Sequence, residues 1–375
     1  MRTFTIHCLT PLVVCLLSGH PEAQRRDVPM SADRWTTVFG KPEFKDHKGT
    51  AAIVFAQEGG VTLNDVLFKD GTVEFDVDPA GMGAGLGFRM QGMKSLELLY
   101  FRPQPNCAGA PDCVQYAPFT REILLWDLFP QHQSPAPLRP SEWNHVKVVI
   151  SGRRMNLFVN GATTPTLAVA SLEGDTQEGQ LALIGPGAFA NFRVTANAVE
   201  GLAAGAAPDP TAGDRRLVRH WQLAPFSPLP EGKEPTIADL PKASAAWRGL
   251  TAERGGLVNV TRVYGLPAKR PIRSVTWLKT TISSKTTQSK QVAIGWAREI
   301  WLFVDGQQVY ADKNLYQPPS ARKPPDGRLS LENGSFVLPL KAGDNEVAVA
   351  LANNFFGWGL ILRLEDLDGI QLARK

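Results

Sequence analysis

A succession of short runs rich in Val, Ile, Phe, Tyr and Trp, beginning near Thr36, most constrains what this chain can fold into. Gly, Pro, Asn or Asp interrupts these runs about every 8 to 12 residues, which is typical of antiparallel strands joined by tight turns. The 34 Gly and 29 Pro exclude coiled coils, disorder and helical bundles, and no strand-helix alternation of a doubly wound fold is present. The sequence therefore predicts an all-β protein.

The runs fall into two groups separated by residues 197–214, a stretch rich in Ala, Gly and Pro. Because this stretch has almost no large apolar side chain, we expect a flexible linker that is anchored in neither core. Residues 30–196 and 215–375 then each form an antiparallel β-sandwich, and 375 residues are enough for two such cores. We expect the two sandwiches to fold independently.

Residues 1–23 have the layout of a secretory signal. Arg2 is followed by an apolar run from Leu9 to Leu17, and polar residues precede Ala23. The run is shorter than the roughly 20 residues that a membrane-spanning helix needs, and no later segment is longer or more apolar. We therefore expect a secreted or periplasmic protein without a membrane span; an apolar N-terminal tail is the alternative.

The cysteines point to a disulfide. Cys8 and Cys15 lie in the signal segment, which leaves Cys107 and Cys113. An export compartment would oxidise this pair, closing a short loop. A metal site is not expected here, because no nearby His or Cys could complete a tetrahedral ligand set.

Charge and short motifs exclude several other functions. Lys and Arg number 40 against 36 Asp and Glu, and no run of five basic residues occurs, so nucleic acid is not an expected partner. The six histidines form no metal-spaced pair, and no Gly-rich phosphate loop or Gly-x-Ser-x-Gly elbow is present. We expect no cofactor, with calcium as an open alternative at the acids described below.

Three pieces of the first half resemble the laminin-G and concanavalin A-like lectin/glucanase family. They are residues 68–77, 143–148 and 157–161, with Pro165 beyond them. The same pieces resemble the domain named for 3-keto-disaccharide hydrolases. The resemblance implies a jelly roll of two stacked antiparallel sheets, one of them concave; such domains mostly bind sugars or proteins, and some hydrolyse glycosides.

The second half is similar to galactose-binding-like jelly rolls and to the sugar-binding domains attached to many glycosidases. Residues 301–307 resemble the family's strand with an Asn-Gly turn, here with Asp305 in place of Asn. Residues 338–347 resemble the strand, turn and strand that follow, and residues 357–359 the Gly-rich turn before the last strand. This resemblance implies a second jelly roll, in a superfamily in which many members bind nothing and serve as spacers.

Alternating acids supply the candidate catalytic residues, Glu74 and Asp76. With Asp78 they occupy one face of a predicted strand, with successive carboxylates roughly 6 to 7 Å apart. The pattern resembles the strand of retaining β-glucanases that carries the nucleophile and the acid/base. It departs from that family at Asp78, where the family has Glu, and at Pro79, which should end the strand. The alternatives are calcium coordination and ordinary solvent-facing acids.

Aromatic and planar polar side chains in the first half suit sugar binding, by stacking and by paired hydrogen bonds. The period of two places Tyr100 and Arg102 on one strand face and Glu97 on the other. Arg89 lies between two apolar residues that should take the core face, so we expect it to point outward. The alternative is a structural role, with the tyrosine on the core rim and the arginines paired to acids. The candidate ligand-binding residues are Arg89, Tyr100, Arg102, Gln115, Tyr116, Trp126 and Trp358.

Two tryptophans of the second half receive opposite predictions. Trp358 lies between two glycines that would leave its ring face open, which is why it is a candidate ligand residue. Trp301 begins a strand in which it shares a face with Phe303, so we expect it in the core.

The sequence thus predicts a protein that binds a polysaccharide or glycan surface without enzymatic activity. Two alternatives stay open: a glycoside hydrolase of β-glucanase-like or keto-disaccharide-like type, and a structural or protein-interaction module without sugar affinity. If sugar binds, Tyr100, Arg102 and Trp126 should carry more of the affinity than Glu74 and Asp76, because stacking and planar hydrogen bonds suit neutral sugars.

Overall fold

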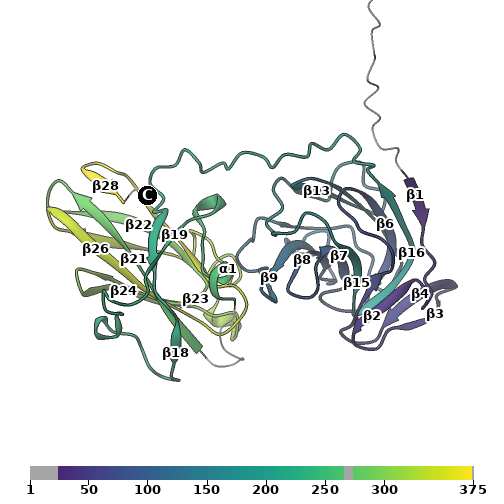
Figure 1. The fold of residues 1–375 in the computed structure, drawn as a ribbon, viewed down its shortest axis with the longest axis horizontal. Helices are drawn as coiled ribbons and strands as arrows, with labels where there is room; N and C mark the ends of the chain where they lie inside the picture. Colours follow the sequence, from purple (N-terminus) through teal and green to yellow (C-terminus); the bar gives the residue numbers. More distant parts are fainter. Residues whose placement is uncertain (1–23, 266–272, 374–375) are drawn as a thin grey trace, which may run out of the picture.

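The computed structural model describes residues 24–265 and 273–373. Within these residues the strands form four antiparallel sheets, which stack in pairs as two β-sandwiches, as the sequence predicted. The sandwiches appear as two lobes side by side in Figure 1. The expected signal, residues 1–23, lies outside the described residues.

The first sandwich contains two eight-stranded sheets. The first sheet has the order β14-β13-β12-β6-β16-β4-β3, with β1 beside β16. Its strands are β1 (Gln24–Asp27), β3 (Glu43–His47), β4 (Thr50–Phe55), β6 (Gly71–Pro79), β12 (Asn144–Ser151), β13 (Arg154–Val159), β14 (Leu167–Val169) and β16 (Gly187–Ala196). The second sheet has the order β10-β9-β8-β7-β15-β5-β2, with β11 beside β9. Its strands are β2 (Trp35–Phe39), β5 (Gly60–Leu63), β7 (Gly85–Met90), β8 (Ser95–Phe101), β9 (Val114–Thr120), β10 (Ile123–Leu124), β11 (Gln133–Ser134) and β15 (Gln180–Ile184).

The core of the first sandwich follows the predicted period of two. The apolar positions of β6 are fully buried, whereas Glu74 and Asp76 between them are partly exposed. Phe75 packs against Phe189 and Phe192 of β16, with ring centroids 6.0 and 6.1 Å apart. Full burial of one such side chain stabilises the fold by roughly 2 to 3 kcal/mol, so the apolar stripes hold the two sheets together.

The second sandwich packs an eight-stranded sheet against a four-stranded one. The larger sheet has the order β19-β17-β21-β26-β23-β24, and β18 and β28 also pair with β21. Its strands are β17 (His220–Leu223), β18 (Ser227–Leu229), β19 (Arg248–Thr251), β21 (Arg273–Ser284), β23 (Arg298–Val304), β24 (Gln307–Asn314), β26 (Gly343–Asn353) and β28 (Ile370–Leu372). The smaller sheet has the order β20-β27-β22-β25, formed by β20 (Val258–Asn259), β22 (Gln288–Trp296), β25 (Gly334–Leu340) and β27 (Gly359–Leu364).

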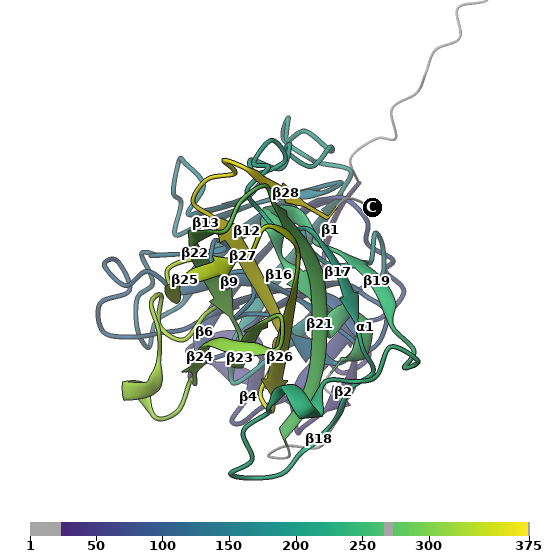
Figure 2. The ribbon, with the colours of Figure 1, turned by 90° about the vertical axis from the view of Figure 1, so that its left-hand side faces the viewer.

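The helical segments are short. They are α1 (Thr261–Tyr264) and the 3-10 turns η1 (Ile237–Asp239), η2 (Arg254–Gly256) and η3 (Pro319–Ala321). Among the described residues, no helix has the length and hydropathy needed to cross a membrane. Figure 2 views the molecule from the side of the second sandwich and shows the long strands β21 and β26 running beside each other.

The two sandwiches are joined by an interface that the sequence analysis did not anticipate. The indole ring of Trp126, just after β10, makes edge-on contacts with Tyr316 and Phe356 of the second sandwich, at centroid distances of 4.9 and 5.8 Å. Next to it, Arg298 of β23 donates to the buried carboxylate of Asp127. Apolar and charged contacts therefore both cross from one sandwich to the other.

Residues 197–214 run between the sandwiches along one side of Figure 1 and are hydrogen-bonded to both. On the first sandwich, the carbonyl of Ala204 accepts from the N–H of Arg153 at 2.7 Å. On the second, Arg254 donates to the carbonyl of Ala207 at 2.7 Å, and Arg219 donates to that of Thr211 at 2.6 Å. Composition predicted a flexible linker. The hydrogen bonds to its main-chain carbonyls attach the segment to both sandwiches.

Candidate functional site

Four of the predicted ligand residues come together at the interface. Nη2 of Arg102 donates to the hydroxyl of Tyr100 at 2.7 Å, and that hydroxyl donates to Oε1 of Gln115 at 2.7 Å. Nε2 of Gln115 in turn donates to the backbone carbonyl of Trp126 at 2.7 Å. All four side chains are buried, so their polar groups serve one another rather than an open face.

The second sandwich covers this cluster. The guanidinium groups of Arg102 and Arg328, one from each sandwich, both lie 5.3 Å from the ring centre of Trp126. The carboxylate of Asp112 accepts from both, at 3.1 Å from Arg102 and 2.9 Å from Arg328. Cation–π contacts and an ion pair shared between the sandwiches occupy the surroundings of Trp126. Trp126 is therefore buried at the interface, and its role as a sugar-stacking residue stays a prediction.

Arg89 is buried, which corrects the expectation that it points outward. Its Nε donates to the carbonyl of Lys69 at 2.9 Å, and its Nη2 donates to Oδ1 of Asp70 at 2.8 Å. The strict alternation fails because Arg89 has φ of +51° and the pairing of β7 with β15 shifts register beside it. Such a bulge changes the direction in which the side chain points, and here the side chain is buried.

Tyr116 belongs to an enclosed polar cluster inside the first sandwich. Its hydroxyl donates to Oε2 of Glu97 at 2.5 Å and accepts from the N–H of Glu173 at 2.7 Å. Nε2 of His132 lies 3.2 Å from Oε1 of Glu173. Burial raises the pKa of Glu97 to about 7, despite the hydrogen bond from Tyr116, and raises the pKa of Tyr116 well above its usual value.

Trp358 is a core residue, which corrects the expectation of an open ring. Its Nε1 donates to the carbonyl of Leu351 at 3.2 Å, and its backbone N–H donates to the hydroxyl of Thr261 at 2.7 Å. The flanking glycines allow close packing instead of an open ring face, since a Cβ at Gly357 would lie 2.5 Å from the side chains of Asp127 and Leu128. Trp301, expected in the core, is 3% exposed and donates to Glu234 at 2.7 Å, which confirms its assignment.

Glu74 and Asp76 share a face of β6 as predicted, and both have partners there. Nδ1 of His145 lies 2.8 Å from Asp76 and Nε2 of the same ring lies 3.7 Å from Glu74. Asn191 donates to Asp76 at 2.6 Å, and Arg193 lies 3.6 Å from Glu74. Their carboxylates are therefore engaged with imidazole, guanidinium and amide groups of the same sheet.

Asp78, the third acid of this strand, pairs with Lys48 at 2.5 Å and with His47 at 2.9 Å. Residues 24–265 and 273–373 contain no group of three or more His, Cys, Asp or Glu side chains suited to hold a metal ion. Calcium coordination by these acids stays a prediction.

The predicted disulfide between Cys107 and Cys113 is confirmed. Both cysteines are buried in the first core, and the N–H of Ala136 donates to the carbonyl of Cys107 at 3.0 Å. The closed loop includes Asp112, so the disulfide holds the acid that pairs with arginines of both sandwiches.

The second sandwich has a groove along the edge of its larger sheet, where two strands share one neighbour. β17 pairs with β21 at residues 278–279, and β28 pairs with it at residues 282–284. Between these segments, Thr280 donates to the carbonyl of His220 at 2.8 Å, and the N–H of Ala373 donates to that of Thr281 at 3.2 Å. Residues before β17 and residues of β28 line a hollow here.

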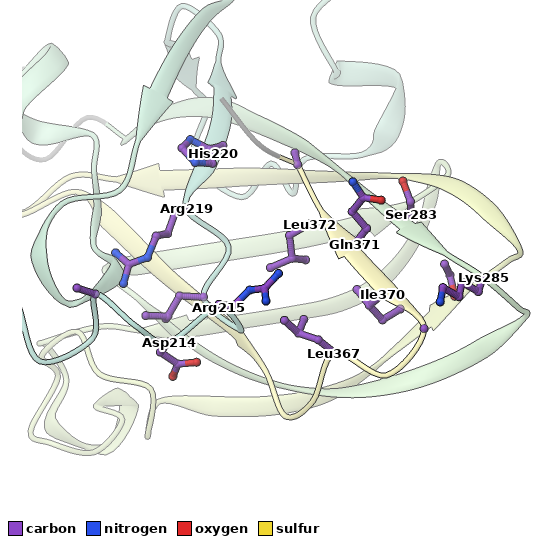
Figure 3. Close-up of a pocket in the computed structure, with 15 residues that line it drawn as sticks. Asp214, Arg215, Arg219, His220, Ser283, Lys285, Leu367, Ile370, Gln371 and Leu372 are labelled. Atoms are coloured by element: carbon purple, nitrogen blue, oxygen red, sulfur yellow. The ribbon is translucent and has the colours of Figure 1, made fainter.

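Two hollows form this groove and meet at His220 and Ala373, which line both. The first has a volume of about 590 Å³ and the second about 780 Å³. Figure 3 shows the first hollow, with Leu367 and Ile370 lying between Arg215 and Lys285 in this view. An apolar floor thus carries polar groups at its sides.

Several polar groups of the first hollow are unengaged. The side chains of Arg215, His220, Lys285 and Gln371 have no hydrogen bond or ion pair with any other residue in the described part of the chain. Asp214, by contrast, accepts from Nε and Nη2 of Arg216 at 2.8 and 2.9 Å, and these hydrogen bonds lower its pKa. The hollow therefore offers free donors and a carboxylate that is already paired.

The second hollow adds an aromatic ring. Trp247 is partly exposed, and its Nε1 donates to the carbonyl of Lys242 at 3.0 Å. Nζ of Lys279 lies 4.5 Å from the centre of this ring and 3.8 Å from the carboxylate of Glu346. The groove thus combines an aromatic side chain with donors and apolar surface.

Sequence reasoning did not find this groove. Arg215, Lys285 and Gln371 come from three distant segments, and Trp247 lies outside any periodic pattern before β19. One feature of the sequence pointed to this region: Arg215 and Arg216 follow Asp214 at the end of the linker, where the composition changes abruptly.

Comparison with known proteins adds a family match for the first sandwich. Residues 30–195 match the model of the 3-keto-alpha-glucoside-1,2-lyase-like domain, which confirms the resemblance to keto-disaccharide hydrolase domains. A comparison with curated proteins found no significant match.

Solved structures with similarity to the chain include carbohydrate-related proteins. Carbohydrate-binding module CBM66 from Bacillus subtilis is 19% identical, with 43% of this chain and 92% of that chain covered and a TM-score of 0.32. A Bacillus subtilis protein of unknown function with a galectin-like fold is 14% identical, with 47% and 96% covered and a TM-score of 0.35. Domain 4 of the arabinanase AbnA from Geobacillus stearothermophilus is 13% identical, with 44% and 83% covered and a TM-score of 0.31. The family match spans the first sandwich, which is thus a jelly-roll domain similar to the 3-keto-alpha-glucoside-1,2-lyase-like domain.

Proposed function

We propose that this protein binds a carbohydrate, without cleaving it, through the groove of the second sandwich. The observation that carries the proposal is the combination, within one groove, of an apolar floor, unengaged planar donors and the partly exposed ring of Trp247. Sugar rings present apolar C–H faces and hydroxyl groups at their edges. Aromatic and aliphatic surface supports the faces, while Arg, Gln and His side chains hydrogen-bond the hydroxyls.

The acids of the groove favour binding over hydrolysis. Cleavage of a glycosidic bond usually requires two carboxyl groups facing the scissile bond, one as acid and one as base or nucleophile. In this groove the carboxylate of Asp214 is held by Arg216, and that of Glu346 lies 3.8 Å from Lys279. Each acid thus has a cationic neighbour.

A glycan-active enzyme is the second candidate, and the family match of the first sandwich favours it. Its test uses the candidate acids directly. Glycans that bind the purified protein are incubated with it, and new reducing ends or unsaturated sugars are measured. Product formation that disappears in Glu74→Gln would replace the binding proposal with a catalytic one.

Two tryptophan substitutions test the binding site. After a glycan array has found a ligand, Trp247→Ala should weaken its affinity by about 10- to 100-fold, as expected for an aromatic hot spot. Trp126→Ala is the matched control, because it removes the same side chain from the buried interface. It should lower the free energy of unfolding while leaving the affinity of the folded protein within about twofold. An affinity loss confined to Trp126→Ala would move the binding site to the first sandwich.

We also propose that the protein works outside the cytoplasm, in the periplasm or the medium. The disulfide between Cys107 and Cys113 supports this, because such bonds persist mainly in oxidising compartments. Cell fractionation followed by N-terminal sequencing tests it. Recovery of the full chain from the cytoplasm with both thiols reduced would contradict export.

A further inference from the structure

We propose that the first hollow of the groove selects sugars that carry a carboxylate, so that the ligand is an acidic saccharide such as a uronate-containing glycan. This inference rests on the proposed function and specifies its ligand. It concerns the space between Arg215 and Lys285, over the floor formed by Leu367 and Ile370.

The charges lining this hollow are unbalanced. Among the residues that the structure describes, its lining contains three cationic side chains, Arg215, Arg219 and Lys285, and one acid, Asp214. Arg216 already pairs with Asp214 through two hydrogen bonds, and Arg363 lies 4.0 Å from the same carboxylate. Asp214 therefore has little capacity left to neutralise the lining cations.

The three cationic side chains differ in whether they already have partners within the protein. Arg219 donates to the carbonyls of Thr211 and Glu253 and lies 3.9 Å from Asp209, so it holds the neighbouring chain in place. Arg215 and Lys285 are exposed, and neither makes an ion pair or side-chain hydrogen bond with another described residue. These two remain available to an anionic ligand.

The residue types then specify the anion. The planar fork of a guanidinium matches the two oxygens of a carboxylate, and the ammonium of lysine adds a second charge-assisted donor. The leucine and isoleucine side chains between them provide apolar surface for the C–H groups of a sugar ring. An acidic saccharide can place its ring on this apolar surface and a carboxylate against one of the two cations, whereas a neutral sugar leaves both cations unpaired.

The experiment compares acidic and neutral oligosaccharides of equal length, in pairs such as oligogalacturonate and galactan or mannuronate and mannan. Isothermal titration calorimetry of the full chain should show, in the pair that binds, about tenfold or greater preference for the acidic member. This preference should decrease as salt is raised, because the cations are exposed. The double variant Arg215→Gln with Lys285→Gln should lose the preference while retaining its affinity for the neutral member.

A matched control removes the same charge elsewhere. Arg26 and Lys41, on the first sandwich, are also exposed, and Arg26→Gln with Lys41→Gln should keep the preference. Equal affinities for the two members of the pair, or a preference that survives in the Arg215 and Lys285 variant, would overturn the inference and leave the carbohydrate proposal intact. A sulfated oligosaccharide that binds as tightly through the same cations would overturn the selection of a carboxylate. Failure of every oligosaccharide to bind would overturn both proposals.

Discussion

Asp127 of the first sandwich and Arg298 of the second form an ion pair in which both side chains are almost completely buried. The N–H of Gly357 donates to both carboxylate oxygens, at 3.1 and 3.2 Å, and Nε of Arg298 donates to the carbonyl of Phe355 at 2.8 Å. Besides bonding each other, both side chains are thus hydrogen-bonded to backbone groups of the second sandwich. A buried pair of this kind is costly to break, because the surviving partner would stay charged in a dry environment.

Removal of one partner should therefore destabilise the protein strongly. We expect Arg298→Met to lower the free energy of unfolding by roughly 3 to 5 kcal/mol, because Asp127 would remain buried without its cation. Urea denaturation followed by tryptophan fluorescence measures this. Lys94→Met is the control, since Lys94 lies 3.7 Å from Glu122 at the surface and should contribute about 1 kcal/mol or less. Equal effects of the two substitutions would contradict the role assigned to the interface.

Cleavage between the sandwiches should leave them associated. Limited proteolysis within residues 197–214 is expected at exposed positions such as Ala203 and Gly205. Because Trp126 and Asp127 contact the second sandwich directly, the two fragments should elute together from a size-exclusion column and unfold in one thermal transition. Separate elution and two transitions would support the independent folding expected from composition.

Loss of the disulfide should weaken both the loop and the interface. We expect Cys107→Ala with Cys113→Ala to lower the free energy of unfolding by about 2 kcal/mol, the chain-entropy value for so short a loop. Asp112 would lose the constraint that presents it to Arg102 and Arg328. Denaturation with and without a reductant measures the effect. The wild type should respond to the reductant and the double variant should not; identical stabilities in all four conditions would contradict the prediction.

Glu97 should make the stability depend on pH. Its pKa is about 7 in the folded protein and near 4.5 when unfolded, so the carboxyl is protonated in both states below pH 4.5. As pH rises from 4.5 through 7 the unfolded state releases its proton first, and the protein should lose roughly 3 kcal/mol, with little further change above that range.

Denaturation at pH 5 and at pH 8 tests this dependence. Glu97→Gln should keep an acceptor for Tyr116 while removing the ionisation, so its stability should fall less between the two values than that of the wild type. Glu122→Gln removes an exposed carboxyl and should preserve the wild-type difference. A pH profile that is unchanged in Glu97→Gln would contradict the prediction.

Local patterns in the sequence determined the elements and part of the chemistry. The alternation along β6 places apolar residues inside and Glu74 with Asp76 on the opposite face, because successive side chains of a strand point to opposite sides. The expected export signal and the two cysteines left outside it were enough to predict the disulfide between Cys107 and Cys113, because an oxidising compartment pairs such thiols. Arg89 marks the limit of this reasoning, because its left-handed φ and the bulge beside it break the period.

Tertiary structure alone decided which surfaces are open. Trp126 has the residue type of a sugar site, but contacts with Tyr316 and Arg328 from the other half of the chain bury it. The fold places Arg215 and Lys285 in the lining of one hollow, although no short-range pattern in the sequence links them. The pattern of a strand indicates which of its faces is apolar. The packing of one sandwich against another depends on contacts between residues far apart in the sequence, and a short sequence window contains no such pair.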